Sequence, residues 1–367
     1  MTYLDNGATS MNKPRAVWEA MCCALDNCAN PGRGGHRATM TAARTVLRCR
    51  ERAAQFFDCA PEQVVFTGNC TQGLNMAIRT LVQPGDRVLI SGFEHNAVVR
   101  PLYALGAQVE VAGRKLFDPA DTLQCFEDGL RRGVKAAVFT HMSNVFGYIL
   151  PVEEMAMLCR RYQVPFVLDA AQSAGVLPVK LKTLGADFIA MPGHKGLLGP
   201  QGTGLLLCSR MPQPLLFGGT GGDSQNPKMP DYLPEGAEAG TLNVPGIAGL
   251  SAALEYLQRV GIEKIFIRQQ HQAKRCAVAL EDMGLQVFHG QAQGGTVSFV
   301  PQCDCEAAAE YLGNKGIAVR AGLHCAPLAH ESAGTLQTGT VRVSFGHDAA
   351  PWQTGNLLLA LENLPKG

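Results

Sequence analysis

The feature that most constrains the fold is an alternation of short apolar runs with longer helical stretches between Glu62 and Cys208. Several of the runs are apolar on both faces, as in strands that helices cover on both sides. We predict strands at QVVFT, DRVLIS, AQVEVA, KAAVFTH, PFVLDAA, DFIAM and GLLLCS. The pattern therefore predicts an α/β fold with a mainly parallel sheet, whose ligand binds at the carboxyl ends of the strands.

The remaining chain predicts a connection and a smaller domain. Residues 211–240 are rich in Gly and Pro, which indicates a long irregular segment of a kind that is often functional. After a helical pattern from Leu242, strands are predicted at LQVFH, GTVSFV, IAVRA and TVRVSF, and helices at DCEAAAEYLGNKG and from Pro351 to Leu364. We expect an N-terminal segment (1–15) that joins the small domain, a large domain (16–255) and a small α+β C-terminal domain (256–367).

Composition excludes several classes of function. The 32 Lys and Arg balance 31 Asp and Glu, and without a basic stripe we expect no nucleic-acid partner. No apolar run approaches the length of a membrane helix, and MTYLDNGATS does not resemble a secretion signal, so we expect no membrane contact and a cytoplasmic location. The odd number of cysteines, 13, indicates reduced thiols, and because no pair has zinc-ligand spacing we expect no metal.

Chemistry is indicated first by two residues at predicted strand ends. Lys195, in PGHKG, lies among glycines that allow a ligand to approach the backbone, although a lone lysine there is also typical of a solvated loop. Asp169 ends the strand in VLDAAQSAG, where a carboxylate must be paired or face a cleft. Enzymes that use pyridoxal 5′-phosphate (PLP) need this combination, a lysine for the Schiff base and an acid beside the ring nitrogen.

Such a cofactor also requires a phosphate site. The segment from Thr67 to Leu81, TGNCTQGLNMAIRTL, leads from a predicted strand through a Gly and polar turn into a helix. The amides and the positive dipole end of a helix N-terminus suit a phosphate. Alternatively, Thr71 is simply the cap of this helix.

Taken together, the motifs resemble the cysteine desulfurase family of the class V aminotransferase fold, nearer its Suf-type than its Isc-type branch. The resemblance extends almost from end to end of the chain. The runs that carry it are YLDNGATS, NPGRGGH, TGNCTQGLN, SGFEHNAVVRPL, MSNVFG, VLDAAQSAG, PGHKGLLGPQGTG, EAGTLNVPGIAGLSAALEY, RAGLHCAP and VRVSFG. It implies the type I PLP-dependent transferase fold.

On the ring side of the cofactor, the resemblance implies a role for each of five residues. Lys195 would be the Schiff-base lysine, Asp169 the partner of the ring nitrogen, and Gln172 a donor to the ring oxygen. His95 would stack on the ring and move the proton of the substrate thiol, although a helix-start histidine with an ordinary pKa is the alternative. Asn144 would lie near both substrate and ring.

On the phosphate side, Cys70 and Thr71 would bind through backbone amides and the Thr hydroxyl, with His194 beside them. Thr241, in EAGTLN, would reach the phosphate bound by the neighbouring subunit. This assignment implies a homodimer.

Two further residues would act on the substrate. Arg342 matches the arginine that binds the substrate α-carboxylate, although the alternation in TVRVSF also permits an outward-facing strand arginine. Cys325, in RAGLHCAP, matches the nucleophilic cysteine, and the polar, Gly- and Pro-bounded loop favours its exposure over a role as buried filler.

Three positions depart from the family pattern. Pro192 stands where many Suf-type relatives have a serine that contacts the phosphate. Gly7 replaces a usual alanine close to the substrate carboxylate, and Leu323 stands where a second loop histidine is common.

We expect a PLP-dependent cysteine desulfurase that converts L-cysteine to L-alanine and forms a persulfide on Cys325, for delivery to a sulfur-acceptor protein. The alternatives are a selenocysteine or cysteine sulfinate lyase, and a class V aminotransferase in which Cys325 has no role. A scaffold that retains PLP without turnover is less consistent with the presence of both Lys195 and Cys325. A nicotinamide site at FGGTGGDS would lack the flanking strand and helix that this fingerprint requires.

Overall fold

The largest element of the protein is a sheet of seven strands, seen in a computed structural model that describes residues 1–32, 34–222 and 225–364. Strand β8 is antiparallel to both of its neighbours, and every other adjacent pair is parallel. The predicted mainly parallel sheet is therefore confirmed. In spatial order the strands are β2 (Val64–Thr67), β8 (Gly204–Cys208), β7 (Phe188–Pro192), β6 (Phe166–Asp169), β5 (Ala136–Thr140), β3 (Arg87–Ser91) and β4 (Gln108–Ala112).

Apolar side chains of this sheet enter two cores, one on each face. In β3, Leu89 belongs to one core and Val88 and Ile90 belong to the other, because successive side chains of a strand point in opposite directions. The core around Val88 is completed by α3 (Cys70–Leu81) and α4 (Asn96–Ala104). The core around Leu89 is completed by α2 (Arg37–Phe57), α5 (Pro119–Arg131), α6 (Val152–Arg161), α7 (Leu181–Leu184) and α8 (Val244–Val260).

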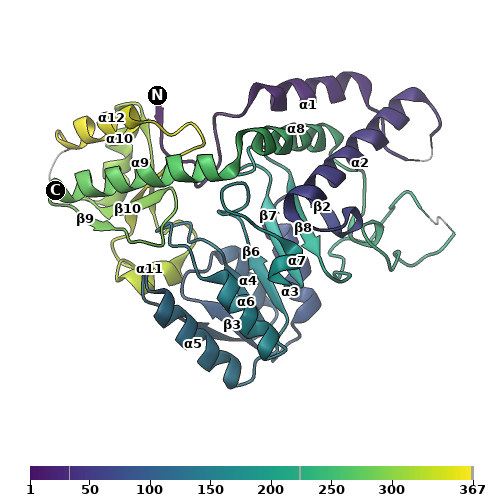
Figure 1. Cartoon of the computed structure of the whole chain (residues 1–367), viewed down its shortest axis with the longest axis horizontal. Coiled ribbons are helices and arrows are strands. Elements are labelled where there is room, and N and C mark those ends of the chain that lie inside the picture. The colour runs from purple at the N-terminus through teal and green to yellow at the C-terminus, as the bar shows by residue number, and fades with distance from the viewer. Residues whose placement is uncertain (33, 223–224, 365–367) are drawn as a thin grey trace.

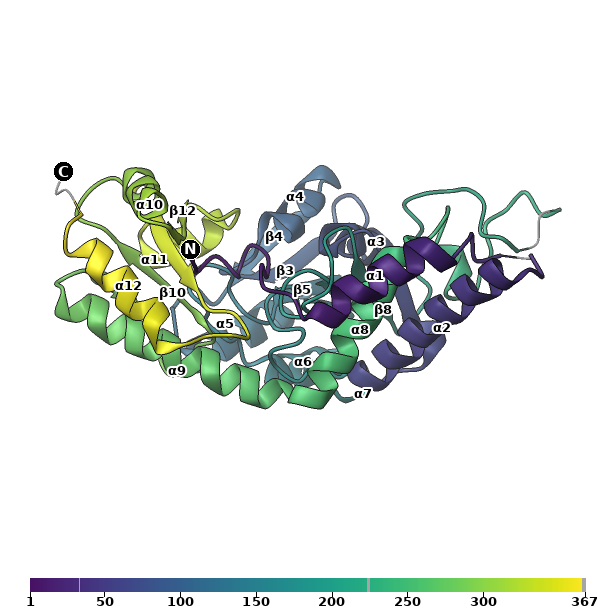
Figure 2. The same cartoon turned by 90° about the horizontal axis from the view of Figure 1, so that it is seen from above.

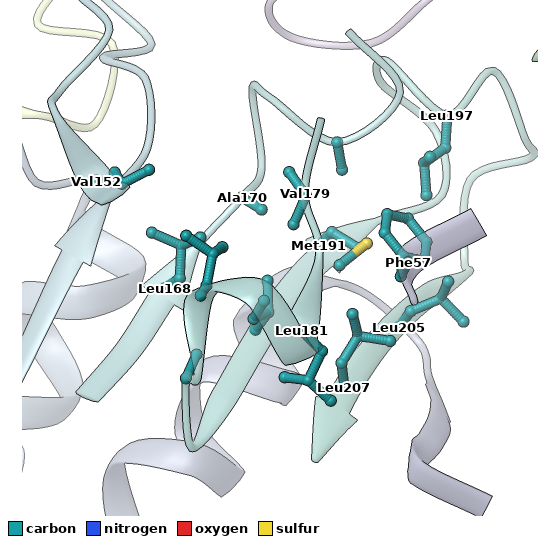
Figure 3. Packing of buried hydrophobic residues seen from close by; sticks show 14 of the residues in the cluster. Phe57, Val152, Leu168, Ala170, Val179, Leu181, Met191, Leu197, Leu205 and Leu207 are labelled. Atoms are coloured by element: carbon teal, nitrogen blue, oxygen red, sulfur yellow. The ribbon is translucent and has the colours of Figure 1, made fainter. Parts of the chain in front are cut away.

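Figure 3 shows part of the core around Leu89, where Leu181 of α7 lies over the strands. Leu168 of β6, Met191 of β7 and Leu205 of β8 point to the same side of the sheet. These strands are buried along their whole length, which explains why their sequences are continuous apolar runs rather than alternating ones.

A second, smaller sheet lies at the other end of the molecule and has its own apolar core (Figure 1). Its antiparallel strands are, in order, β12 (Arg320–Gly322), β13 (Thr340–Ser344), β10 (Thr296–Val300) and β9 (Gln286–Phe288). The helices that supply side chains to this core are α9 (Ile262–Asp282), α10 (Cys305–Asn314) and α12 (Pro351–Leu361). A short helix, α11 (Pro327–Ala333), follows β12.

The run IAVRA was predicted as one strand, and here the prediction was wrong. It forms two short strands, β11 (Ile317–Ala318) and β12, which belong to different sheets. Strand β11 pairs in parallel with β1 (Thr2–Tyr3), whereas β12 pairs with β13. A local pattern gives the apolar positions of a run but not the partner of each residue, which is why the break at Val319 was missed.

The N-terminal segment connects the two ends of the molecule. Strand β1 forms a two-stranded sheet with β11 beside the small sheet, and the chain then enters α1 (Arg15–Asn27), which packs on α8 together with α2 (Figure 2). Helix α8 continues past residue 255 and ends at Val260, followed directly by α9. The division of the chain at 15/16 and 255/256 remains a prediction.

In its described residues, 211–222 and 225–240, the connection is irregular apart from one turn of 3-10 helix (Glu235–Ala237), and a similar turn (Pro61–Gln63) precedes β2. It contains the glycines of FGGTGGDS, of which Asp223 and Ser224 lie outside the described residues, as do Arg33 of NPGRGGH and residues 365–367 of the predicted small domain. Among the helices of the described ranges, none has the length and hydropathy to cross a membrane.

Candidate active site

Residues from distant parts of the sequence line a pocket of about 520 Å³, partly open to solvent, at the carboxyl ends of the large sheet. This is the edge at which the ligand was expected. The sequence-predicted residues among its lining are Cys70, Thr71, His95, Asn144, Asp169, Gln172, His194 and Lys195. Three predicted residues, Thr241, Cys325 and Arg342, are not part of this lining.

Asp169 and Lys195 supply opposite charges to the pocket. Asp169 ends β6 and is almost fully buried, and its Oδ1 accepts hydrogen bonds from Ala171 N at 2.8 Å and from Cys70 Sγ at 3.6 Å. Burial raises the pKa of Asp169, while the Ala171 amide and the charge of Lys195 act against this rise. Burial likewise lowers the pKa of Lys195, and Asp169 opposes this shift. The pair therefore provides an amine that loses its proton more easily than a solvated lysine and a buried acid that needs a cationic partner.

The N-terminus of α3 opens at the same pocket, with Cys70 as its first residue. Asn69, not Thr71, caps this helix, because Asn69 Oδ1 accepts a hydrogen bond from Gln72 N at 2.9 Å. The interpretation of Thr71 as a mere cap is therefore wrong. Its side chain is exposed and remains available to an anion at the helix N-terminus, which the helix dipole also favours.

His95 caps α4, and its hydrogen bond defines its tautomer. Its Nδ1 accepts from Ala97 N at 3.0 Å, so in the neutral ring the proton is on Nε2. Burial, followed by the charges of Lys195 and Arg100, lowers the pKa of His95 to about 4. The alternative of an ordinary pKa is thus wrong, and His95 is a neutral Nε2–H donor at pH 7.

The neighbouring Glu94 was not predicted from the sequence. It is fully buried, and its carboxylate accepts hydrogen bonds from Ser91 Oγ and from Thr140 N, which connects the ends of β3 and β5. Burial raises the pKa of Glu94 to about 8. A single sequence offers no signal for this group, because Glu is usually exposed.

Arg342 lies on β13 and is buried, which excludes the outward-facing alternative. Its Nη1 donates to Asn144 O at 3.0 Å, and its Nη2 donates to Asp5 Oδ1 at 2.7 Å. The Nδ2 of Asn144 in turn donates to His324 O at 2.8 Å. Asn144 therefore connects the buried guanidinium to the loop that carries Cys325.

Cys325 is exposed on the connection between Gly322 and Pro327. Its carbonyl oxygen accepts a hydrogen bond from Asn96 N at 2.7 Å, so its backbone adjoins the residue that follows His95. The preceding side chain, His324, is buried, and neither of its ring nitrogens has a hydrogen-bond partner among the described residues. The structure thus brings Cys325 to the edge of the pocket that His95 lines.

The N-terminal segment forms another wall of the site. Gln172 Nε2 donates to Gly7 O at 3.0 Å, and His194 Nδ1 lies 3.0 Å from Thr9 Oγ1. A Cβ added at Gly7 would lie 3.2 Å from Arg342 Cζ, so the glycine allows the guanidinium to approach the backbone closely. Of these contacts, the sequence indicated only the position of Gly7 near the substrate carboxylate.

Thr241 lies in a separate cavity of about 760 Å³, partly open to solvent, with Thr67, Gly68 and Gln72. Its lining shares no residue with that of the pocket that contains Lys195. Within one chain, Thr241 therefore does not join the pocket that contains Lys195.

The residues of the pocket fit the cofactor predicted from the sequence. An amine of lowered pKa, a buried carboxylate and a helix N-terminus match, in turn, the aldehyde, the ring nitrogen and the phosphate of PLP. Pro192, which lacks an N–H and a hydroxyl, also lines the pocket. Pro192 therefore offers no hydrogen-bond donor to a ligand in this pocket.

Comparisons with known proteins agree on one family. The profile described as Aminotransferase class-V matches residues 2–351. The chain is similar to a probable cysteine desulfurase from Methanothermobacter thermautotrophicus, with 34% identity over 94% of this chain and 89% of that protein. It is also similar to a cysteine desulfurase from Escherichia coli, with 31% identity over 89% of this chain and 84% of that protein.

Solved structures share the fold. A cysteine desulfurase from Thermococcus onnurineus superposes with a TM-score of 0.89 and 32% identity, covering 98% of this chain and 93% of the other. A cysteine desulfurase from Escherichia coli gives a TM-score of 0.82 with 27% identity, covering 98% and 94%. The predicted type I PLP-dependent transferase fold is confirmed.

Proposed function

This chain belongs to the class V aminotransferase family, and from its site we propose that it is a PLP-dependent cysteine desulfurase. One observation carries the proposal beyond the family. An exposed cysteine, Cys325, adjoins the pocket in which Lys195 and Asp169 lie together. Transamination requires the lysine and the acid but makes no use of a thiol.

PLP is the cofactor of this enzyme, and the pocket supplies a partner for each of its groups. When bound, it supplies an aldehyde that links to amines and a ring that withdraws electrons from the substrate Cα. Lys195 Nζ would hold the aldehyde, Asp169 would be the partner of the ring nitrogen, and Gln172 would donate to the ring oxygen. The N-terminus of α3, with Cys70 and Thr71, would hold the phosphate, with His194 beside it.

One side chain would move a proton and another would donate a hydrogen bond. The amine of Lys195 would remove the substrate Cα proton and return it as L-alanine forms, a task favoured by its lowered pKa. His95 carries its proton on Nε2 and is neutral, so it donates a hydrogen bond through Nε2, whereas loss of that proton would leave an unfavourable imidazolate. We therefore propose that His95 orients the substrate through a hydrogen bond from Nε2 rather than removing the proton of its thiol.

Arg342 binds the substrate α-carboxylate. Its guanidinium is held from two sides by Asn144 O and Asp5, and the N–H groups that these partners leave free are available to a carboxylate. This orientation directs the substrate side chain toward the loop of Cys325, because Asn144 contacts both Arg342 and His324.

Sulfur transfer then balances without an external oxidant. The Cys325 thiolate forms an S–S bond with the substrate sulfur while the substrate Cβ–S bond breaks. The electron pair of the broken bond remains on Cβ, which takes a proton and becomes the methyl group of L-alanine. The enzyme is left with a persulfide on Cys325, which a thiol reductant or an acceptor protein converts back to the free thiol.

Two features support the assembly and the location that we propose. The position of Thr241 outside its own chain's pocket is consistent with a homodimer in which Thr241 reaches the partner's phosphate. All 13 cysteines are free thiols, as is usual in the reducing cytoplasm.

Product analysis tests the function. Purified protein reconstituted with PLP is incubated with L-cysteine and dithiothreitol, and alanine and sulfide are measured together. We expect equal amounts of the two products without any added oxo acid, and none from the Lys195→Ala variant. Amino-group transfer that depends on an oxo acid would instead indicate an aminotransferase, and a strong preference for selenocysteine or cysteine sulfinate would indicate one of the related lyases.

A further inference from the structure

One carboxylate, that of Asp5, binds two arginines that lie far away in the sequence. Asp5 Oδ1 accepts from Arg342 Nη2 at 2.7 Å, and Asp5 Oδ2 accepts from Arg320 Nη2 at 2.8 Å and from Arg320 Nε at 3.1 Å. Within the described ranges, neither guanidinium forms an ion pair with any other carboxylate. The three groups therefore carry a net charge of +1.

The geometry of Asp5 is set by the backbone rather than by the arginines. Asp5 is bridged to Ser344 at the end of β13, where Ser344 N donates to Leu4 O at 2.7 Å and Asn6 N donates to Ser344 O at 3.3 Å. The carboxylate is thus presented from a fixed segment. A change of its charge alone leaves these contacts in place.

The two arginines lie on neighbouring strands, Arg320 on β12 and Arg342 on β13. If the proposed function holds, Arg342 binds the α-carboxylate and the substrate side chain reaches Cys325. Arg320 begins β12, which leads directly into the Cys325 loop, and its guanidinium is half exposed. If the substrate side chain reaches Cys325, a negative charge on it would therefore lie on the side of the site that carries Arg320.

We infer that Asp5 determines specificity by neutralising one of the two arginines, so that the site accepts amino acids with one carboxylate and disfavours those with a second acidic group. This inference rests on the proposed function and names its substrate class. A single α-carboxylate cancels the net charge of +1, whereas an acidic side chain adds a negative charge that no group of this trio balances. Cysteine is therefore favoured over cysteine sulfinate and aspartate.

The inference is tested by binding rather than by turnover. Dissociation constants of L-alanine and L-aspartate for the PLP-loaded protein are measured from the change in cofactor absorbance at low ionic strength. In Asp5→Asn the net charge rises to +2, and we expect the affinity for L-aspartate relative to L-alanine to increase at least about tenfold. The ratio of the two affinities is the readout, because a general disturbance of the site would weaken the binding of both ligands to a similar extent.

A second variant predicts the opposite change. Arg320→Gln lowers the net charge to zero, so the relative affinity for L-aspartate should fall several-fold, and the double variant should return toward the wild-type ratio. Asp348→Asn is the matched control, since Asp348 accepts a hydrogen bond from Asn12 and pairs with neither arginine. Its ratio should equal that of the wild type.

An unchanged ratio in Asp5→Asn, or a ratio that does not fall in Arg320→Gln, would overturn the inference. If Asp5→Asn does not fold, Arg320→Gln decides alone. The sulfide assay is independent of these titrations. A wild-type protein that binds L-alanine but releases no sulfide from L-cysteine would therefore refute the proposed function without affecting the role of Asp5.

Discussion

Two adjacent residues of the site, His324 and Cys325, have left-handed backbone conformations, with φ of 53° and 56°. Such angles are costly for residues with a side chain and persist only where surrounding contacts enforce them. Two hydrogen bonds do so here, from Asn144 Nδ2 to His324 O and from Asn96 N to Cys325 O. They turn the Cys325 side chain outward while the His324 ring is buried.

Replacement of Cys325 by Ala should abolish persulfide formation and lower sulfide release at least about a hundredfold, because the sulfur then has no nucleophile to receive it. The change in cofactor absorbance on adding L-cysteine should persist, since Lys195 and Asp169 are intact. Persulfide is measured by alkylation and mass spectrometry. Cys303→Ala, at a partly buried position outside the pocket, should behave as the wild type. Sulfide release from Cys325→Ala at the wild-type rate would show that another residue is the nucleophile.

Between elements, the loop after β6 and the loop that carries Lys195 pack backbone against backbone. A Cβ at Gly175, which has a φ of 83°, would overlap Gly196 O, and a Cβ at Gly196 would overlap Ala174 O. The glycines around Lys195 were expected to let a ligand approach the backbone. Gly196 also lets the backbones of these two loops pack closely against each other. This contact holds Lys195 relative to Asp169.

We expect Gly175→Ala to destabilise the protein by about 3 kcal/mol or more, since it combines an unfavourable φ with a backbone overlap. Thermal unfolding and the fraction of bound PLP should both fall. Gly185→Ala is the matched control, because Gly185 also has a positive φ, of 67°, but has open space around its Cβ position. It should cost about 1 kcal/mol and leave PLP binding intact. Equal losses in the two variants would show that the loop contact is unimportant.

On the scale of the whole molecule, four of the exposed large apolar side chains belong to segments at one end. Trp18 and Leu25 of α1, Leu47 of α2 and Phe217 of the 211–240 connection are each at least half exposed. Both views place these segments together, at the end opposite the small sheet (Figures 1 and 2). An apolar surface of this kind is typical of a subunit interface.

We therefore predict that the protein is a dimer in solution, with twice the mass of the chain by light scattering. Leu25→Glu should give a monomer at micromolar concentration and weaken PLP binding, because the partner's Thr241 is then lost from the phosphate. Met157→Glu on α6 is the control, since Met157 is similarly exposed, at 56% against 68% for Leu25, but lies on another surface. A Leu25→Glu variant that stays dimeric would place the interface elsewhere.

Stability should fall on acidification. Burial lowers the pKa of His95, His141, His194 and His330 to about 4, against about 6.5 in the unfolded chain. Between these values the unfolded state binds more protons, so the free energy of unfolding decreases as the pH falls. Glu94, whose pKa is raised to about 8, acts in the opposite direction, as do Asp169 and Glu238, whose pKa values burial also raises. The histidines are more numerous, because burial lowers the pKa of His324 and His347 as well.

The melting temperature of the PLP-free protein should accordingly be lower at pH 5 than at pH 7. His141→Asn should reduce this pH dependence, because it removes one of the buried groups that must gain a proton on unfolding. A melting temperature that rises on acidification would contradict the assignment of these histidines as neutral in the folded state.

The sequence by itself determined the strands of the large sheet and the edge at which its ligand binds. Strands buried on both faces have continuous apolar sequences, which makes them recognisable. Parallel strands bring their carboxyl ends to one edge of the sheet, so Asp169 and Lys195 were expected together. The resemblance of its motifs to a known family added the roles of residues such as His95, Arg342 and Cys325.

Only the tertiary structure decided how these residues act on one another. The ion pairs of Asp5 with Arg320 and Arg342 span more than 300 positions, the tautomer of His95 depends on one hydrogen bond, and Glu94 acquires its raised pKa only by burial. The split of IAVRA between two sheets and the overlap avoided at Gly175 are likewise contacts between distant segments. A local pattern encodes which residues are apolar or polar, but charge balance, protonation and backbone approach depend on partners that folding alone brings within reach.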